Sequence, residues 1–192
     1  MENNKYKYFP MPIVIVAYIL SAAQIAELIY SMTRVTSLAE ILVALVGIAA
    51  RVCAIIFFAK GFGKDANRYY RAYFLLVAAK FLLEDFLLIF SDNGLIPHSE
   101  AMLLLFEEII CYGNVLVLGV AKDLGKIKSV LLAAVNAAVY AFGLVSALIA
   151  YDPAAVDSFE NLLGNIAWFL GAVICLLMVF AKYADKEARG TK

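Results

Sequence analysis

Residues 39–59 read AEILVALVGIAARVCAIIFFA, and this stretch decides the fold because only Glu40 and Arg51 interrupt its apolar side chains. A helix of about 20 such residues is long enough to cross the hydrocarbon layer of a bilayer. Other stretches of the chain have a similar length and composition. The sequence therefore predicts membrane-spanning helices at residues 11–30, 39–59, 73–90, 101–120, 130–150 and 162–180.

The composition of the whole chain supports an all-α polytopic membrane protein. Of its 192 residues, 65% are hydrophobic and 17% are charged, whereas a soluble domain has about 45–50% apolar and about 25% charged residues. A core of this size cannot enclose that excess of apolar side chains. We therefore expect a single transmembrane domain over residues 1–192 in the cell membrane. Since 16 basic and 16 acidic residues balance, no nucleic-acid partner is expected.

The basic residues predict how the chain is oriented in the membrane. Turn-forming residues divide the six predicted spans into three hairpins. Lys and Arg near helix ends are retained on the cytoplasmic side. Thirteen of them fall on one predicted side, whereas Arg34 alone falls on the other, so both termini are predicted to be cytoplasmic. The thirteen are Lys5, Lys7, Lys60, Lys64, Arg68, Arg71, Lys122, Lys126, Lys128, Lys182, Lys186, Arg189 and Lys192.

Ionisable side chains inside the predicted spans are the main functional signal. Each costs roughly 2.5–3.5 kcal/mol at a helix centre, and such residues face the bundle interior, pair with one another and mark functional sites. They are Glu27, Arg51, Lys80, Glu84, Asp85, Glu107 and Glu108. Because acids outnumber bases, we expect some of the acids to be protonated, to share a proton, or to hold a cation.

The acids are predicted to form one layer in the outer half of the membrane. A rise of about 1.5 Å per residue places Glu27, Asp85 and the Glu107–Glu108 pair roughly 10 Å below the outer face. Asn165 reaches the same level from the outer end of the last predicted span. A layer supplied by three helices favours a polar cavity. The alternative is that these acids only fix helix packing.

The two bases are predicted to lie deeper, near the midplane. Arg51 and Lys80 are each roughly 13 Å from the cytoplasmic end of their predicted helix. Lys80 and Glu84 are four residues apart, so they share a helix face and can pair. Glu108 and Tyr112 share a face by the same spacing.

Metal and cofactor chemistry has no motif in the sequence. Cys53, Cys111 and Cys175 are isolated in apolar runs, and His98 is the single histidine. Neither a zinc site nor a disulfide framework is therefore expected. The motifs of serine hydrolases and of nucleotide-binding proteins are also absent from the sequence. We expect no bound metal and no cofactor.

Residues 74–88 read FLLVAAKFLLEDFLL, and this run resembles the third-helix motif of the YhhN-type lysoplasmalogenase family. That family has a Leu-Leu-Gly-Asp-x-Leu-Leu run with a characteristic Asp, which Asp85 matches, while Glu84 stands in place of the Gly. Arg51 stands where the family has a Lys on its second helix. In place of the His that precedes a Tyr on its fourth helix, the chain has Glu107 or Glu108 before Tyr112. The resemblance covers residues 51–112.

The resemblance implies an integral membrane hydrolase that cleaves the vinyl-ether bond of lysoplasmalogens. That reaction begins when a carboxylic acid protonates the enol-ether carbon, and a second carboxylate then activates water. A buried acid layer of unequal pKa values supplies both roles. On this hypothesis Asp85 and Glu108 are the acid and the base, and Glu27 or Glu84 tunes them.

The same hypothesis assigns a substrate-binding set around the acids. Arg51 or Lys80 balances their charge or meets the lipid phosphate, and further polar side chains complete the set. Its members are Arg51, Lys80, Glu107, Tyr112 and Asn165. The expected partners are membrane lipid and a lysophospholipid substrate, with a homo-oligomer left open.

The competing hypothesis is a small transporter or a membrane substrate-binding subunit. In it the acid layer binds a proton, a cation or a cationic solute. A small chain of six helices with both termini inside, and with small residues along its first helix, is also similar to the membrane substrate-binding subunits of vitamin uptake systems. A third alternative is a scaffold protein whose charges pair internally.

Overall fold

The computed structural model describes residues 11–34, 37–60, 64–90, 98–121, 124–155 and 158–190. These residues form helices and short connections, so the prediction of an all-helical chain is confirmed for the described ranges. The helices are α1 (Met11–Met32), α2 (Leu38–Lys60), α3 (Lys64–Phe90), α4 (His98–Val120), α5 (Lys126–Ile149) and α6 (Ser158–Gly190).

Helix length and hydropathy agree with a membrane protein. In the described part of the chain, four helices are long and apolar enough to cross a membrane, namely α1, α2, α5 and the Ser158–Ala184 part of α6. Of the other two, α3 begins at Lys64 with a charged and polar segment, and the described side chains of α4 include a shorter apolar stretch at Ile109–Val120.

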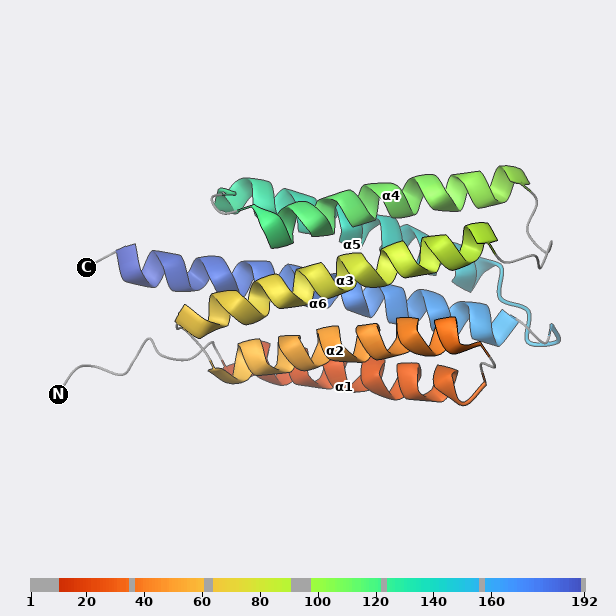
Figure 1. Ribbon diagram of the computed structural model, residues 1–192, viewed down its shortest axis with the longest axis horizontal. Coiled ribbons are helices and arrows are strands. Elements are labelled where there is room, and N and C mark those ends of the chain that lie inside the picture. The colour runs from red at the N-terminus through yellow and green to blue at the C-terminus, as the bar shows by residue number, and fades with distance from the viewer. Residues whose placement is uncertain are drawn as a thin grey trace.

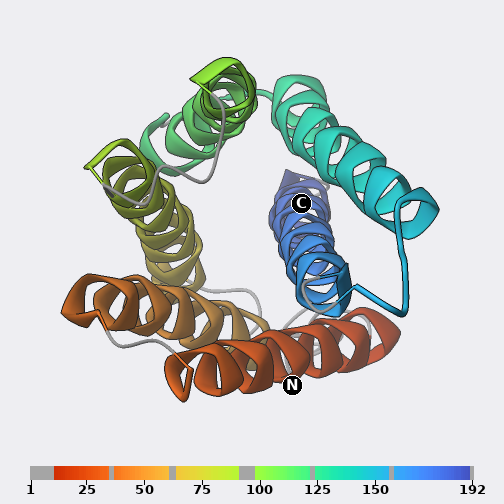
Figure 2. The same cartoon turned by 90° about the vertical axis from the view of Figure 1, so that its right-hand side faces the viewer.

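The helices lie side by side along a common axis, and successive helices run in opposite directions (Figure 1). α1 begins and α6 ends at the same end of the bundle, which we call the terminal end. The connections from α1 to α2, from α3 to α4 and from α5 to α6 lie at the opposite end, which we call the loop end. Viewed along the bundle axis, α1 to α5 surround α6 (Figure 2). α6 packs against α1, α3 and α5.

Short polar residues set the helix boundaries at the loop end. The Ser37 hydroxyl accepts a hydrogen bond from the Ala39 amide at 3.2 Å and so caps the start of α2. Beyond the end of α5, the Asp152 carboxylate accepts a hydrogen bond from the Ala154 amide at 2.9 Å across the intervening proline. An ion pair between Arg34 and Glu160 joins the α1–α2 connection to the first turn of α6.

Large aromatic side chains fill the terminal half of the bundle. Phe57 of α2 and Tyr70 and Phe74 of α3 are almost completely buried. The ring centroids of Tyr70 and Phe74 are 4.7 Å apart, and those of Phe57 and Tyr70 are 6.0 Å apart. Tilted aromatic pairs of this kind add to the stabilisation that burial of the rings gives. The apolar core is therefore most compact away from the loop end.

Candidate functional site

A cavity of about 550 Å³ lies between α1, α2, α3 and α6. We call it the loop-end pocket, because Ser31, Ser37 and Glu40 beside the α1–α2 connection line it. Its volume is within the range of about 300–1,000 Å³ that small-molecule sites occupy. Its lining residues are Gln24, Glu27, Leu28, Ser31, Ser37, Glu40, Val43, Ala44, Arg51, Lys80, Glu84, Leu87, Gly164, Ala167 and Trp168.

The charged residues of the pocket are graded by depth. At about 1.5 Å of rise per residue, Glu40 lies within one turn of the loop-end terminus of α2. Glu27 and Glu84 lie about 8–9 Å from the loop-end termini of α1 and α3. Lys80 lies about 15 Å and Arg51 about 20 Å from the loop-end termini of their helices. The carboxyl groups are therefore near the mouth, and the two cations are deeper.

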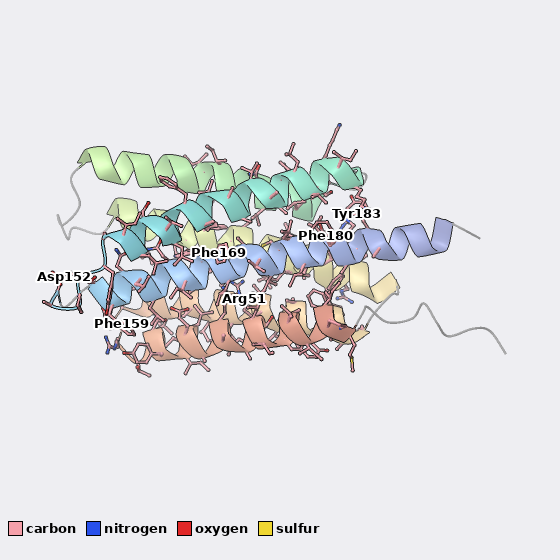
Figure 3. All side chains as sticks on the ribbon, turned by 180° about the vertical axis from the view of Figure 1, so that it is seen from behind. Arg51, Asp152, Phe159, Phe169, Phe180 and Tyr183 are labelled. Atoms are coloured by element: carbon pink, nitrogen blue, oxygen red, sulfur yellow. The ribbon has the colours of Figure 1, made fainter. Side chains whose placement is uncertain are left out.

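Arg51 forms the floor of the pocket and lies between α6 and the α1–α2 pair (Figure 3). Its side chain is only 6% exposed. The Nε group donates a hydrogen bond to the Gln24 side-chain oxygen, and the guanidinium lies 5.8 Å from the centroid of the Tyr73 ring. The buried Nη1 atom has no hydrogen-bond partner among the residues that the structure describes. Because buried polar groups are normally satisfied, this atom indicates a site for an acceptor.

Gln24 and Gly171 hold the guanidinium in place. The Gln24 side-chain nitrogen donates a hydrogen bond to the carbonyl oxygen of Ala167 on α6, so one amide joins α1, α2 and α6. A Cβ atom added to Gly171 would lie 3.0 Å from Gln24 Nε2 and 3.1 Å from Arg51 Nη2. Only a glycine leaves space there for both side chains. The sequence reasoning missed this junction, although a lone Gln in an apolar helix was a usable signal.

Lys80 lies on the α3 wall of the pocket and is 7% exposed. Its Nζ is 2.5 Å from Glu84 Oε1, so the ion pair expected from their four-residue spacing is present. The same Nζ lies 3.8 Å from the centroid of the Trp168 ring. The Trp168 ring in turn stacks at 5.2 Å on Phe81 and at 5.6 Å on Tyr140. Two partners therefore satisfy the ammonium group, and this cation is less available to a ligand than Arg51.

The structure brings together Glu27, Arg51, Lys80 and Glu84 from the predicted set, since all four line the loop-end pocket. They come from α1, α2 and α3. By helix rise, Glu27 and Glu84 lie nearer the loop end than Lys80 and Arg51, and the assignment of the loop end to the outer face stays a prediction. For three predicted members the side chains lie outside what the structure describes, and these are Asp85, Glu107 and Glu108.

Two further predicted residues do not line the pocket. The Asn165 side chain donates hydrogen bonds to the backbone and side-chain oxygens of Asn161, and it lies against Gly143 of α5. Its neighbour Gly164 lines the pocket, and consecutive helical residues point about 100° apart. Tyr112 of α4 packs against the apolar core. Asn165 is predicted from depth alone, and Tyr112 from the helix face that it shares with Glu108 and from the family resemblance, but neither side chain lines the pocket.

A second, smaller cavity of about 20 Å³ also borders Arg51. Asn136 borders it and is held by the Asn114 amide, which donates a hydrogen bond at 2.8 Å to its side-chain oxygen. A cavity of this size has space for about one water molecule. Its lining residues are Arg51, Tyr73, Val77, Phe81, Val115, Asn136, Tyr140, Trp168, Gly171, Ala172 and Cys175. Arg51 and Trp168 therefore border both this inner cavity and the loop-end pocket.

Comparison with protein-family models, curated proteins and solved structures found no match. The resemblance to the YhhN-type lysoplasmalogenases therefore stays a prediction. Among the described side chains, no group of three or more His, Cys, Asp and Glu residues is placed to hold a metal ion. What the site can do follows from its own geometry, which combines an accessible pocket, a buried guanidinium at its floor and carboxyl groups nearer its mouth.

Proposed function

We propose that this chain is a six-span membrane protein that binds a small organic anion in the loop-end pocket. In this proposal both termini are cytoplasmic, and the pocket opens to the outer face. The distribution of basic residues supports the orientation, because Lys and Arg are retained on the cytoplasmic side. Lys60, Arg68, Lys126 and Lys182 lie toward the terminal end, whereas Arg34 lies at the loop end.

The proposal that α3 crosses the membrane is supported by the contacts that its charged side chains make inside the bundle. Lys80 and Glu84 form an ion pair inside the bundle, and Lys80 also contacts the Trp168 ring. Paired charges that face a cavity or the bundle interior are the kind that spanning helices tolerate. α3 can therefore cross the membrane although its composition is more polar than that of α1 or α2.

The observation that carries the proposal is the buried guanidinium of Arg51 with an unpartnered nitrogen. Within the described residues its side chain donates to the neutral amide of Gln24, while Nη1 has no acceptor. A guanidinium recognises carboxylates and phosphates through paired N–H groups. At about 4 Å and an effective dielectric constant of about 20, attraction between unit charges is about 4 kcal/mol. An anion from outside would supply the missing acceptor and offset part of the cost of burying Arg51.

The pocket is shaped for capture of such an anion from the outer face. It reaches the α1–α2 connection at the loop end, and the aromatic core formed by Phe57, Tyr70 and Phe74 fills the bundle toward the terminal end. A ligand can therefore enter from one end while the other end stays closed. This arrangement fits the outward-facing site of a transporter or of a substrate-binding subunit.

Calorimetry with purified protein in detergent tests the proposal. We expect at least one of five small probes to bind, namely butyrate, γ-aminobutyrate, succinate, ethyl phosphate and phosphoethanolamine. Arg51→Gln should weaken binding about 10- to 100-fold, since a hydrogen bond to a charged group contributes about 1.5–3 kcal/mol. Arg51→Lys keeps the charge without the paired N–H groups and should recover only part of the affinity.

The matched control is Arg34→Gln, which removes an exposed ion pair at the rim of the bundle and should leave affinity unchanged. Size-exclusion profiles of all variants establish that each is folded. If none of the probes binds the unaltered protein, or if a folded Arg51→Gln variant binds as tightly as that protein, the proposal is wrong.

A lipid hydrolase is the second candidate, favoured by a specific observation. Glu27 and Glu84 line one pocket, which places two carboxyl groups where an acid and a base could act on one ligand. Incubation with a lysoplasmalogen should then release free aldehyde, and Glu27→Gln or Asp85→Asn should abolish the release. Lysophospholipid without a vinyl-ether bond is the control substrate. Absence of aldehyde from the unaltered protein would exclude this candidate.

A further inference from the structure

We propose that the ligand of the loop-end pocket is a small zwitterion. Its acidic group would lie on Arg51, and a primary ammonium group would lie on Glu27, one helical turn nearer the mouth. This inference rests on the proposed anion-binding function and adds the substrate class. It also gives the Glu27 carboxyl group a role, which anion binding alone does not.

Glu27 is half-buried and lines the pocket. No hydrogen bond or ion pair joins its carboxyl group to another described side chain. A carboxyl group in a spanning helix is costly unless it has a partner. Arg51 Nη1 lacks an acceptor among the described residues while Glu27 lacks a donor there, and both residues line one cavity. A ligand that carries both an acid and an ammonium group would satisfy both.

The spacing of the two groups is set by α1. Gln24 and Glu27 are three residues apart, so they lie on the same face of the helix about 4.5 Å apart along its axis. Gln24 holds Arg51 directly. The Glu27 carboxyl group is therefore expected about one turn above the guanidinium. A ligand whose two charged groups are separated by only a few bonds fits this interval.

The other charges of the pocket favour a zwitterion over a dianion. Lys80 is already paired with Glu84 and lies on the Trp168 ring. A second acidic group on the ligand would instead approach Glu27, and Glu40 lies further out toward the mouth. Like charges placed close together discriminate against a wrong ligand. Specificity for a zwitterion thus comes from attraction at two positions and repulsion of a second acid.

Two sources share this ligand chemistry. One is a free amino acid, which carries a carboxylate and an ammonium group. The other is a phosphoethanolamine group, free or on a lipid, which carries a phosphate and an ammonium group. A cavity of about 550 Å³ has space for either. The acid that Arg51 prefers distinguishes the two sources, so the experiment includes a carboxylate arm and a phosphate arm.

The test compares matched probes by calorimetry on the full chain in detergent. In the carboxylate arm, γ-aminobutyrate, butyrate and succinate share a four-carbon chain and differ at one end. We expect γ-aminobutyrate to bind about tenfold more tightly than butyrate, and succinate to bind most weakly. In the phosphate arm, phosphoethanolamine should bind more tightly than ethyl phosphate by a similar factor if the source is the headgroup.

Variants assign the ammonium preference to one residue. Glu27→Gln, which is nearly isosteric, should remove the advantage of the zwitterion over the matched anion while leaving the affinity for the anion within about twofold. Glu160→Gln, an acid outside the pocket lining, is the control and should keep the advantage. Arg51→Gln should weaken the zwitterion and the matched anion alike.

The outcomes separate this inference from the proposed function. If butyrate binds as tightly as γ-aminobutyrate and ethyl phosphate as tightly as phosphoethanolamine, while Arg51→Gln abolishes binding, the anion site stands and the zwitterion is wrong. The same holds if folded Glu27→Gln protein keeps the full preference for the zwitterion. If no probe binds, or if Arg51→Gln changes nothing, the proposed function and this inference both fail.

Discussion

The terminal and loop ends of the bundle are built from the same helices but are filled in opposite ways. Toward the terminal end, Phe57, Tyr70 and Phe74 interlock with almost no exposed surface. Toward the loop end, α1, α2, α3 and α6 enclose the pocket, and its lining includes both acids and bases. One bundle therefore has an apolar packed half and a polar hollow half.

The difference between the two halves indicates which one stabilises the fold and which one binds the ligand. Burial of large aromatic side chains stabilises the terminal half, and removal of one of them leaves a cavity. In the loop half, Gln24, Arg51 and Lys80 are buried polar groups that need partners. Substitutions in the first half should therefore lower stability without changing what the pocket holds, whereas substitutions in the second half should change ligand binding as well as stability.

The largest effect is expected from Phe74→Ala at the terminal end. Phe74 is 0% exposed and contacts the rings of Tyr70 and Tyr73. Its truncation should lower the free energy of unfolding by about 3–5 kcal/mol, the range for Phe→Ala in a packed core. Thermal unfolding in detergent, followed by circular dichroism, measures the change.

The control for this substitution is Phe142→Ala on α5, where the side chain is 72% exposed and should contribute little. Equal destabilisation by both substitutions would contradict the assignment of stability to the terminal half. The same holds if folded Phe74→Ala protein loses ligand while its melting temperature stays the same.

A smaller effect is expected from Lys80→Met at the pocket wall. The substitution leaves the Glu84 carboxyl group without its ion pair, and the loss of one partner of a buried pair costs about 3–5 kcal/mol. We expect the lower end of that range, because the Glu84 side chain is 25% exposed to the pocket. Melting temperatures of Lys80→Met, Glu84→Gln and the double variant give the coupling energy between the two side chains.

The double variant should be more stable than Lys80→Met alone, because the carboxylate that lost its ion pair with Lys80 is then absent. A coupling energy near zero would show that the pair contributes nothing, and the loop half would then resemble an ordinary water-filled surface.

The smallest effect on stability, with a clear effect on binding, is expected from Gly171→Ala. The added methyl group would crowd Gln24 and Arg51, and overpacking of this kind costs about 1–3 kcal/mol. Displacement of the guanidinium should weaken anion binding. Calorimetry and thermal unfolding on the same sample measure both quantities.

Gly164→Ala is the matched control, since it lies on the same helix, lines the same pocket and leaves its added Cβ with nothing within 4 Å. It should bind and unfold like the unaltered protein. Equal effects at the two glycines would contradict the role given to the Gln24–Arg51–Gly171 junction.

The sequence predicted the helical class because long apolar runs have few other solutions in a membrane. The helix boundaries were predicted less well. The apolar segment that begins at Tyr73 belongs to a helix that already begins at Lys64, and α6 continues to Gly190, beyond the predicted span at 162–180. Hydropathy detects only the part of a helix suited to lipid, whereas backbone hydrogen bonding continues through the polar turns that follow.

Within the site, spacing along one helix was a better guide than depth across several. The Lys80–Glu84 pair could be predicted because both residues belong to one helix. Asn165 was assigned by depth alone and faces α5 instead. Gln24 was missed because its role depends on Arg51 and Ala167, which belong to two other helices. Contacts between helices depend on rotation about each axis, and one sequence does not specify that rotation.

The central position of α6 has a consequence for how the protein is made. Ribosomal synthesis delivers α6 after the other five helices, so on the proposed topology α1 to α5 enter the bilayer before the helix that supplies Ala167 and Trp168 to the pocket walls. The hydrogen bond that Arg51, the deepest cation of the pocket, donates to Gln24 does not depend on α6. Arg51 and its hydrogen-bond partner Gln24 belong to the same first hairpin, and that hairpin can insert with the guanidinium already held by an amide. The ligand site is then completed only when the last helix joins the bundle.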